Sequence, residues 1–104
     1  MKLEEFAKVL ETTGYPVAFY EFTKEDPAGS IPFICYLPIQ PDIFGADDAV
    51  YYSQTWIQVE LYTEDKDLAA EANVEHALAS FFYSKDEGKI DSENIYMVKY
   101  QLFI

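Results

Sequence analysis

Apolar side chains recur along this chain with two different spacings, one helical and one extended. Residues 2–13 repeat them every three or four positions, the spacing of an amphipathic helix. The residues of this stripe are Leu3, Phe6, Ala7 and Leu10. Gly14 and Pro16 favour a stop directly afterwards. A second helix is predicted over residues 66–81, after the candidate N-caps of Thr63–Asp67. Its inward stripe is Ala70, Val74, Ala77, Leu78 and Phe81.

Extended segments fill most of the remaining chain. Strands are predicted over Val17–Phe22, Ile31–Leu37, Tyr51–Tyr62 and Asn94–Ile104, with a short strand over Phe82–Lys85. The turn-forming residues 23–30 predict a hairpin between the first two strands. The segment Asp86–Lys89 is expected to be a solvated turn, and Pro38–Ala49 an irregular loop.

Alternation is clearest in the strand predicted over residues 51–62. One face carries Ile57, Val59 and Leu61, which indicates burial. The opposite face carries Tyr52, Trp56 and Tyr62 among glutamine and glutamate residues. This second face is expected either to be a wet aromatic surface or to pack under a helix.

The order of elements predicts an α+β fold. An N-terminal helix precedes a largely antiparallel sheet of four to five strands, and a second helix packs on the same face before the last strands. The 104 residues fit a single domain, 1–104. No apolar run approaches the ~20 residues that cross a bilayer, so a membrane partner is not expected.

Charge excludes some functions. Nineteen acidic residues against seven basic ones give a net charge of −12. All seven basic residues are lysines, so the bidentate guanidinium fork that reads guanine or clamps phosphate is missing. Sequence-specific binding of nucleic acid is therefore not expected.

Catalytic and metal-binding patterns are also weak. Cys35 lies in an apolar run and is expected to be a buried thiol, and His76 to be a surface or boundary residue. The acidic run around Gly88 fails the calcium-loop register, because Tyr83 and Lys85 stand where acids are needed. The sequence therefore predicts no enzyme, no metal and no cofactor.

Aromatic content favours a binding module instead. Nine tyrosines, eight phenylalanines and one tryptophan exceed what a core of this size encloses. Exposed tyrosine and tryptophan often dominate protein interfaces. The apolar residues Ile43 and Phe44 beside Gly45 are a second candidate contact.

Several segments follow one another in a characteristic order: Phe19–Phe22, Pro32–Leu37, Phe44–Asp48, Val59–Thr63 leading into Asp65–Asp67, and Ser92–Glu93 leading into Ile95–Tyr100. This order resembles that of a known family, the small tail-completion or tail-terminator proteins of long-tailed phages and prophages of Gram-positive bacteria. The resemblance covers nearly the whole chain.

The resemblance implies an assembly role without catalytic or metal residues. Such proteins form a six-membered ring on the finished tail tube, stop its growth and present the surface to which the head docks, while DNA passes through. The implied partners are further copies of the chain, the tail tube protein and head connector proteins. The implied location is the bacterial cytoplasm during assembly and then the virion tail.

A head-to-tail ring needs two different complementary patches on each subunit. The candidate subunit or tail interface is Ile43, Phe44, Gly45, Tyr52, Trp56 and Tyr62. The candidate acidic lumen or docking surface is Asp47, Asp48, Asp86 and Glu87. Two other interpretations stay open: a different head–tail role, such as head closure or tail chaperone, and an acidic inhibitor or immunity-type protein that binds a basic partner.

Overall fold

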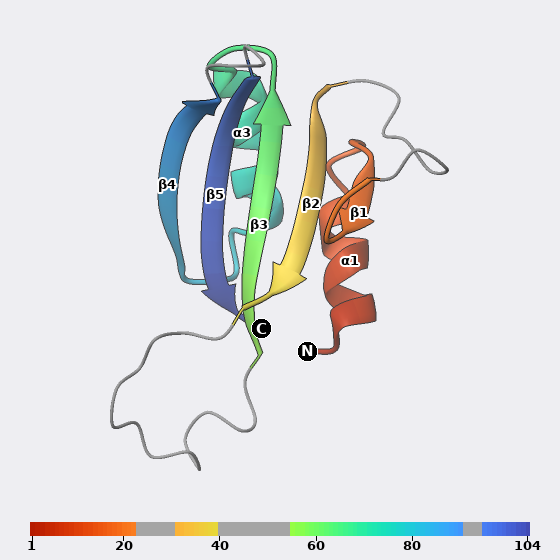
Figure 1. Cartoon of the computed structure of the whole chain (residues 1–104). Coiled ribbons are helices and arrows are strands. Elements are labelled where there is room, and N and C mark those ends of the chain that lie inside the picture. Colours follow the sequence, from red (N-terminus) through yellow and green to blue (C-terminus); the bar gives the residue numbers. More distant parts are fainter. Residues whose placement is uncertain (23–30, 40–54, 91–94) are drawn as a thin grey trace.

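In the part of the chain that the structure describes, one sheet pairs with two helices. A computed structural model describes residues 1–22, 31–39, 55–90 and 95–104. Within them, the elements in chain order are α1 (Leu3–Glu11), β1 (Val17–Phe19), β2 (Phe33–Pro38), β3 (Trp56–Thr63), α3 (Leu68–Ala77), β4 (Tyr83–Ile90) and β5 (Ile95–Phe103) (Figure 1). The strands form one five-stranded sheet in the order β1-β2-β3-β5-β4. This arrangement confirms the predicted α+β fold class.

Strand directions correct one prediction. The pairs β2–β3, β3–β5 and β4–β5 are antiparallel, but β1 and β2 run parallel, with Val17 opposite Ile34. A hairpin joins antiparallel strands, so the hairpin expected between these two segments is wrong. The residues predicted as its turn, 23–30, lie outside the described residues.

The first helix forms as its pattern predicts. Phe6 and Leu10 have no exposed surface and face the sheet. The helix ends where the hydroxyl groups of Thr12 and Thr13 donate to backbone carbonyls one turn earlier. Gly14 follows with φ = 83°, a left-handed conformation that glycine adopts without strain.

The second helix is shorter than predicted. The carboxylate of Asp67 accepts a hydrogen bond from the backbone N–H of Ala70 at 3.0 Å, which caps the N-terminus. The helix ends at Ala77 rather than near residue 81. Phe81 still reaches the core, where its ring meets that of Phe6 edge to face.

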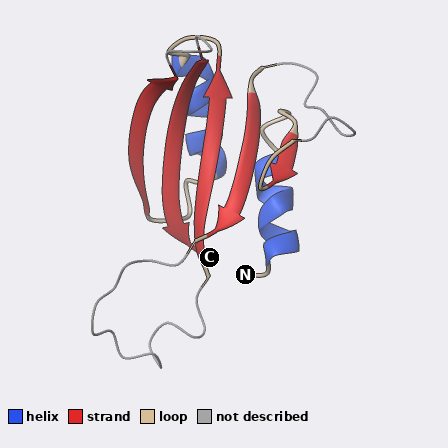
Figure 2. Cartoon of the chain, in the orientation of Figure 1, coloured by secondary structure: helices blue, strands red, loops and turns tan. Residues whose placement is uncertain are grey.

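Both helices cover the same face of the sheet (Figure 2). Alternate residues of β3 and β5 point toward them, as the two-residue period predicts. The core contains the fully buried strand residues Ile34, Ile57, Val59, Leu61, Val98, Tyr100 and Leu102 and the helix residues Phe6, Leu10, Val74 and Leu78. The apolar core of the described residues therefore lies on this one side of the sheet.

The strand β4 is longer than the short segment predicted for it. Asp86–Lys89, expected as a turn, lies inside β4 and pairs with β5. Nearly every side chain of β4 is exposed, since the strand lies at the edge of the sheet. The solvated turn predicted for Asp86–Lys89 is therefore wrong, because these residues form part of an edge strand.

Candidate functional site

The sheet face opposite the helices is the candidate functional site. We call it the open face, because no helix in the described part of the chain covers it (Figure 2). Alternation and strand register place there Phe33, Cys35, Leu37, Trp56, Gln58, Glu60, Tyr62, Asp86, Met97, Lys99, Gln101 and Phe103. Apolar rings and sulfur or aliphatic groups thus share this face with amides and charges.

Trp56 and Tyr62 lie at the two ends of the open face on β3, and both are half-buried. The sequence left open whether their face is a wet surface or is packed under a helix. Both helices of the described residues lie on the other face, so neither of these helices packs over Trp56 or Tyr62. Tyr52, predicted beside them, lies outside the described residues.

Each of the two aromatic residues has a fixed neighbour. The ring of Trp56 lies 3.9 Å from that of Phe103 on β5. The ring of Tyr62 stacks on Phe33 of β2 at 4.9 Å, and Phe22 meets Phe33 edge to face. These contacts hold the rings in place, so a partner bound at this face would order fewer side chains and bind at a lower entropic cost.

Between the aromatic ends, polar groups form a connected chain across β3 and β5. The Gln101 side-chain amide donates to Gln58 at 2.9 Å, and Gln58 donates to Glu60 at 2.6 Å. The Tyr62 hydroxyl donates to the other oxygen of Glu60 at 2.8 Å. Burial and this hydrogen bond raise the pKa of Tyr62 above its usual range. The chain therefore presents an ordered polar strip with its internal hydrogen bonds already made.

Cys35 lies at the same face but is 3% exposed, which confirms the expected burial. Burial, with the nearby negative charge of Glu60, raises the pKa of its thiol to about 11. A thiol that stays protonated at neutral pH is a weak nucleophile. His76 is exposed on α3, on the other side of the sheet, as expected for a surface residue. The two residues therefore do not form a nucleophile–base pair.

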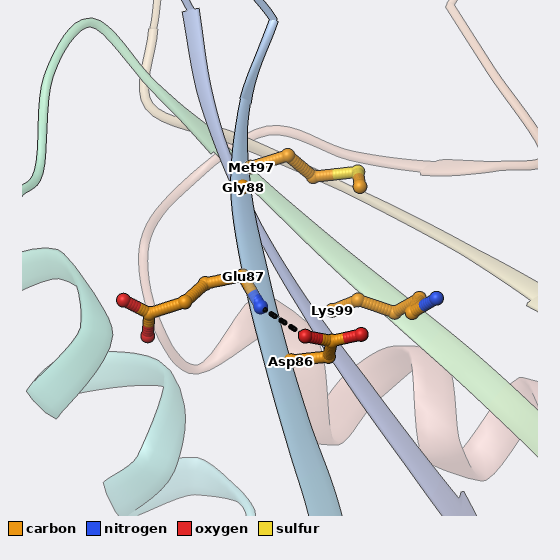
Figure 3. Close-up of a pocket in the computed structure, with 5 residues that line it drawn as sticks. All are labelled: Asp86, Glu87, Gly88, Met97 and Lys99. Carbon is orange, nitrogen blue, oxygen red and sulfur yellow. Dashed lines mark hydrogen bonds between the residues drawn. The ribbon is translucent and has the colours of Figure 1, made fainter.

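The two described acidic candidates separate onto opposite faces. Asp86 points to the open face near Lys99, whereas Glu87 points to the helix side (Figure 3). With Gly88 and Met97 they line a shallow hollow of about 130 Å³. Pockets that enclose drug-sized ligands begin near ~300 Å³, so the hollow does not indicate a small-molecule site.

The remaining predicted site residues are not placed. Ile43, Phe44, Gly45, Asp47 and Asp48 lie outside the described residues.

An ionic cluster between α3 and β4 escaped the sequence analysis. Glu71 is only 3% exposed, yet lies 2.9 Å from the Lys66 ammonium and 2.8 Å from that of Lys85. One of its oxygens, Oε2, has the Lys66 ammonium beside it but no well-aligned hydrogen bond. The other oxygen, Oε1, accepts a hydrogen bond from the Lys66 ammonium at 2.9 Å, so the buried charge is held by the two lysines through both attraction and hydrogen bonding.

Two further carboxylates complete the cluster. Glu75 pairs with Lys85 at 2.7 Å and accepts the Tyr100 hydroxyl at 2.8 Å. Glu87 pairs with Lys66 at 2.9 Å and accepts the Tyr96 hydroxyl at 2.6 Å. The cluster ties α3 to the edge of the sheet. No short motif marks it, because its members come from three separate segments.

Some exposed apolar residues outside the open face were not among the interface residues predicted from the sequence. Phe82, in the connection from α3 to β4, is 99% exposed. Phe19 and Tyr20, at the end of β1, are about half exposed and touch each other edge to face. Exposed rings of this kind mark contact surfaces more often than scattered aliphatic residues do.

Neither metal ligation nor membrane spanning is indicated by the described residues. In those ranges, no three or more His, Cys, Asp or Glu side chains gather where they could hold a metal ion. Their helices include none with the length and apolar character to span a membrane. Comparison with known proteins adds no family, since no protein-family model and no curated protein sequence matches the chain.

Proposed function

We propose that the protein is a structural subunit of a phage tail, a terminator that caps the tail tube as a ring and contributes to the head–tail joint while DNA passes through. The resemblance of its segments to tail-completion proteins motivates this role. The observation that carries it is the open face, where aromatic side chains remain half-buried and no helix of the described residues lies over them.

Two unlike surfaces support a head-to-tail ring in particular. The open face offers the ring pairs Trp56–Phe103 and Tyr62–Phe33. Phe19 and Tyr20 offer a separate exposed aromatic edge at β1. Contacts that close a ring join two different patches of neighbouring subunits.

Asp86 is the better of the two described candidates for a docking or lumen surface. Its carboxylate is exposed on the open face, whereas the charge of Glu87 is matched by Lys66. An acidic lumen would let DNA slide without sticking.

Disruption of this gene in the phage or prophage that carries it tests the proposal. Negative-stain microscopy should then show over-long tails beside DNA-filled heads. Tails of normal length that fail to join heads would assign the protein to head closure, and a loss of tails would assign it to tail chaperoning. Normal joined virions would contradict every assembly role.

The acidic inhibitor is a second candidate, favoured by the exposed acidic residues Glu4, Glu5 and Glu11 on α1 and by the net charge of −12. An inhibitor that binds a basic partner by charge loses affinity steeply as salt rises. Binding to isolated tail tubes through the aromatic open face should weaken much less. Pull-downs on tail tubes at low and high salt separate the two functions.

A further inference from the structure

The outer edge of β4 carries backbone groups that lack a strand partner within the described residues. β4 is the last strand of the sheet, beyond β5 (Figure 1). Unpaired edges of this kind are templates for pairing with another strand. The hydrogen-bonding pattern of the sheet shows which residues of β4 direct their backbone N–H and C=O groups away from β5.

One hydrogen bond near the end of β5 determines which residues of each strand direct their backbone groups toward which neighbouring strand. The Ile104 N–H donates to the Thr55 carbonyl, so odd-numbered residues of β3 bond toward β5. Because bonding direction alternates along a strand, odd-numbered residues of β5 bond toward β4. In the observed register the odd-numbered residues of β5 lie opposite even-numbered residues of β4, so it is the even-numbered residues of β4 that bond to β5. Tyr83, Lys85, Glu87 and Lys89 therefore direct their N–H and C=O groups outward.

One of these outward groups is already occupied. The N–H of Glu87 donates to the Asp86 carboxylate at 2.9 Å (Figure 3). An incoming strand must displace this bond, so Asp86 blocks the middle of the edge.

The sequence of β4 is otherwise suited to antiparallel pairing with another β4. In the register centred on Asp86, all four outward residues of each strand find an outward partner. Lys85 then stands opposite Glu87 of the other copy, twice. Opposite rather than like charges face each other at these positions, although each side chain already has an ion pair within its own copy. The registers centred on Glu87 and on Gly88 are poorer. The first sets Lys85 against Lys89 and Glu87 against itself, and the second pairs only Glu87 and Lys89 among the outward residues.

Asp86 is the exception in the favoured register, since the two Asp86 carboxylates face each other at a non-hydrogen-bonded position. Side chains at such positions are the closest in a ladder, and like charges there oppose pairing. We infer that the β4 edge is complementary to the β4 edge of a second copy except at Asp86, and that Asp86 keeps free copies from pairing there. The inference does not depend on the proposed tail function.

Analytical ultracentrifugation of three proteins tests it. Relative to the parent, Asp86→Ala should tighten self-association by about tenfold or more. The substitution removes both the carboxylate that occupies the Glu87 N–H and the repulsion between the two Asp86 side chains. Asp86→Asn keeps an oxygen for the Glu87 N–H and removes only the charge, so its affinity should fall between the two. Self-association of Asp86→Ala no stronger than that of the parent would overturn the inference, whether the parent is a monomer or a ring.

Cysteine cross-linking tests the register separately. Asp86→Cys places two thiols at a facing position with Cα atoms about 4.5 Å apart, within reach of a disulfide. Ser84→Cys is the matched control, since its two copies would lie about 14 Å apart at 3.4 Å per residue. Mild oxidation should give covalent dimers of the first variant only. Equal cross-linking of both variants, or of neither, would contradict this register.

Discussion

The two faces of the sheet differ in how completely their side chains are buried. On the helix side, β3 places Ile57, Val59 and Leu61 in a core without exposed surface. On the open face, the alternate residues of the same strand remain half-buried and meet rings and amides of neighbouring strands. One strand thus serves stability with one set of side chains and leaves the other set available to a partner.

Core truncation should have the largest effect on stability. Leu61→Ala removes a fully buried side chain between the sheet and the helices, and is expected to lower the free energy of unfolding by about 2–5 kcal/mol. Met97→Ala, on the open face of β5, should cost less than about 1.5 kcal/mol. Urea denaturation of both variants measures the contrast. Equal losses would mean that the open face is as important to folding as the core.

The ionic cluster should show the next largest effect. Lys85→Met leaves the buried carboxylate of Glu71 with one lysine, and should cost about 1–3 kcal/mol. This is less than for a fully buried pair, because the Lys85 side chain is 32% exposed. Lys89→Met is the matched control on the same strand, since Lys89 forms no ion pair among the described residues. Similar urea midpoints for the two variants would remove the cluster from the account of stability.

Acid should weaken the helix side by protonating the cluster. Burial of Glu75 acts to raise its pKa, but hydrogen bonds from Lys85 and Tyr100 outweigh burial and hold the pKa below the ordinary 4.5. A carboxyl group with a lowered pKa in the folded state stabilises the fold above its unfolded pKa, and this contribution is lost as pH falls through the folded value. Unfolding free energy should therefore decline below about pH 4.5. Glu75→Gln should make that decline shallower in urea titrations at several pH values. A variant whose decline matches that of the parent would contradict this assignment.

Truncating the open-face tryptophan should affect stability less than truncating the core. Trp56→Ala removes a half-buried ring that packs on Phe103, and should cost about 1–2 kcal/mol while leaving the far-ultraviolet circular dichroism unchanged. Its effect on tail binding should be far larger, because buried tryptophans are frequent interface hot spots. His76→Ala, on the exposed surface of α3, is a control that should change neither property. A folded Trp56→Ala protein that binds tail tubes as the parent does would remove this residue from the interface.

Sequence patterns predicted the elements whose two faces differ. The amphipathic stripe of α1 and the alternation in β3 and β5 report burial on one side. As a result α1, β5 and the end of β3 were predicted within a few residues, whereas the predicted start of β3 at Tyr51 lies outside the described residues. The face shared by Trp56 and Tyr62 followed from the same alternation. Only the first part of β4 was predicted, because Lys85–Lys89 is polar throughout and its side chains are exposed on both faces.

Contacts between segments far apart in the chain could not be predicted from the sequence. The parallel pairing of β1 with β2 depends on how distant segments align, whereas the polar residues between them indicated only a turn. The ionic cluster combines Lys66, Glu71 and Lys85 from separate elements, and no local spacing relates the lysine of β4 to the glutamate of α3.

Complementation of the gene-disrupted phage with Trp56→Ala tests the central claim most directly, namely that the open face joins the protein to its assembly partners. Tail lengths would be measured by negative-stain microscopy, beside complementation with the parent gene and with His76→Ala. The account predicts over-long, unjoined tails with Trp56→Ala and normal virions with the other two genes. Normal tail length with Trp56→Ala, at equal amounts of folded protein, would contradict it.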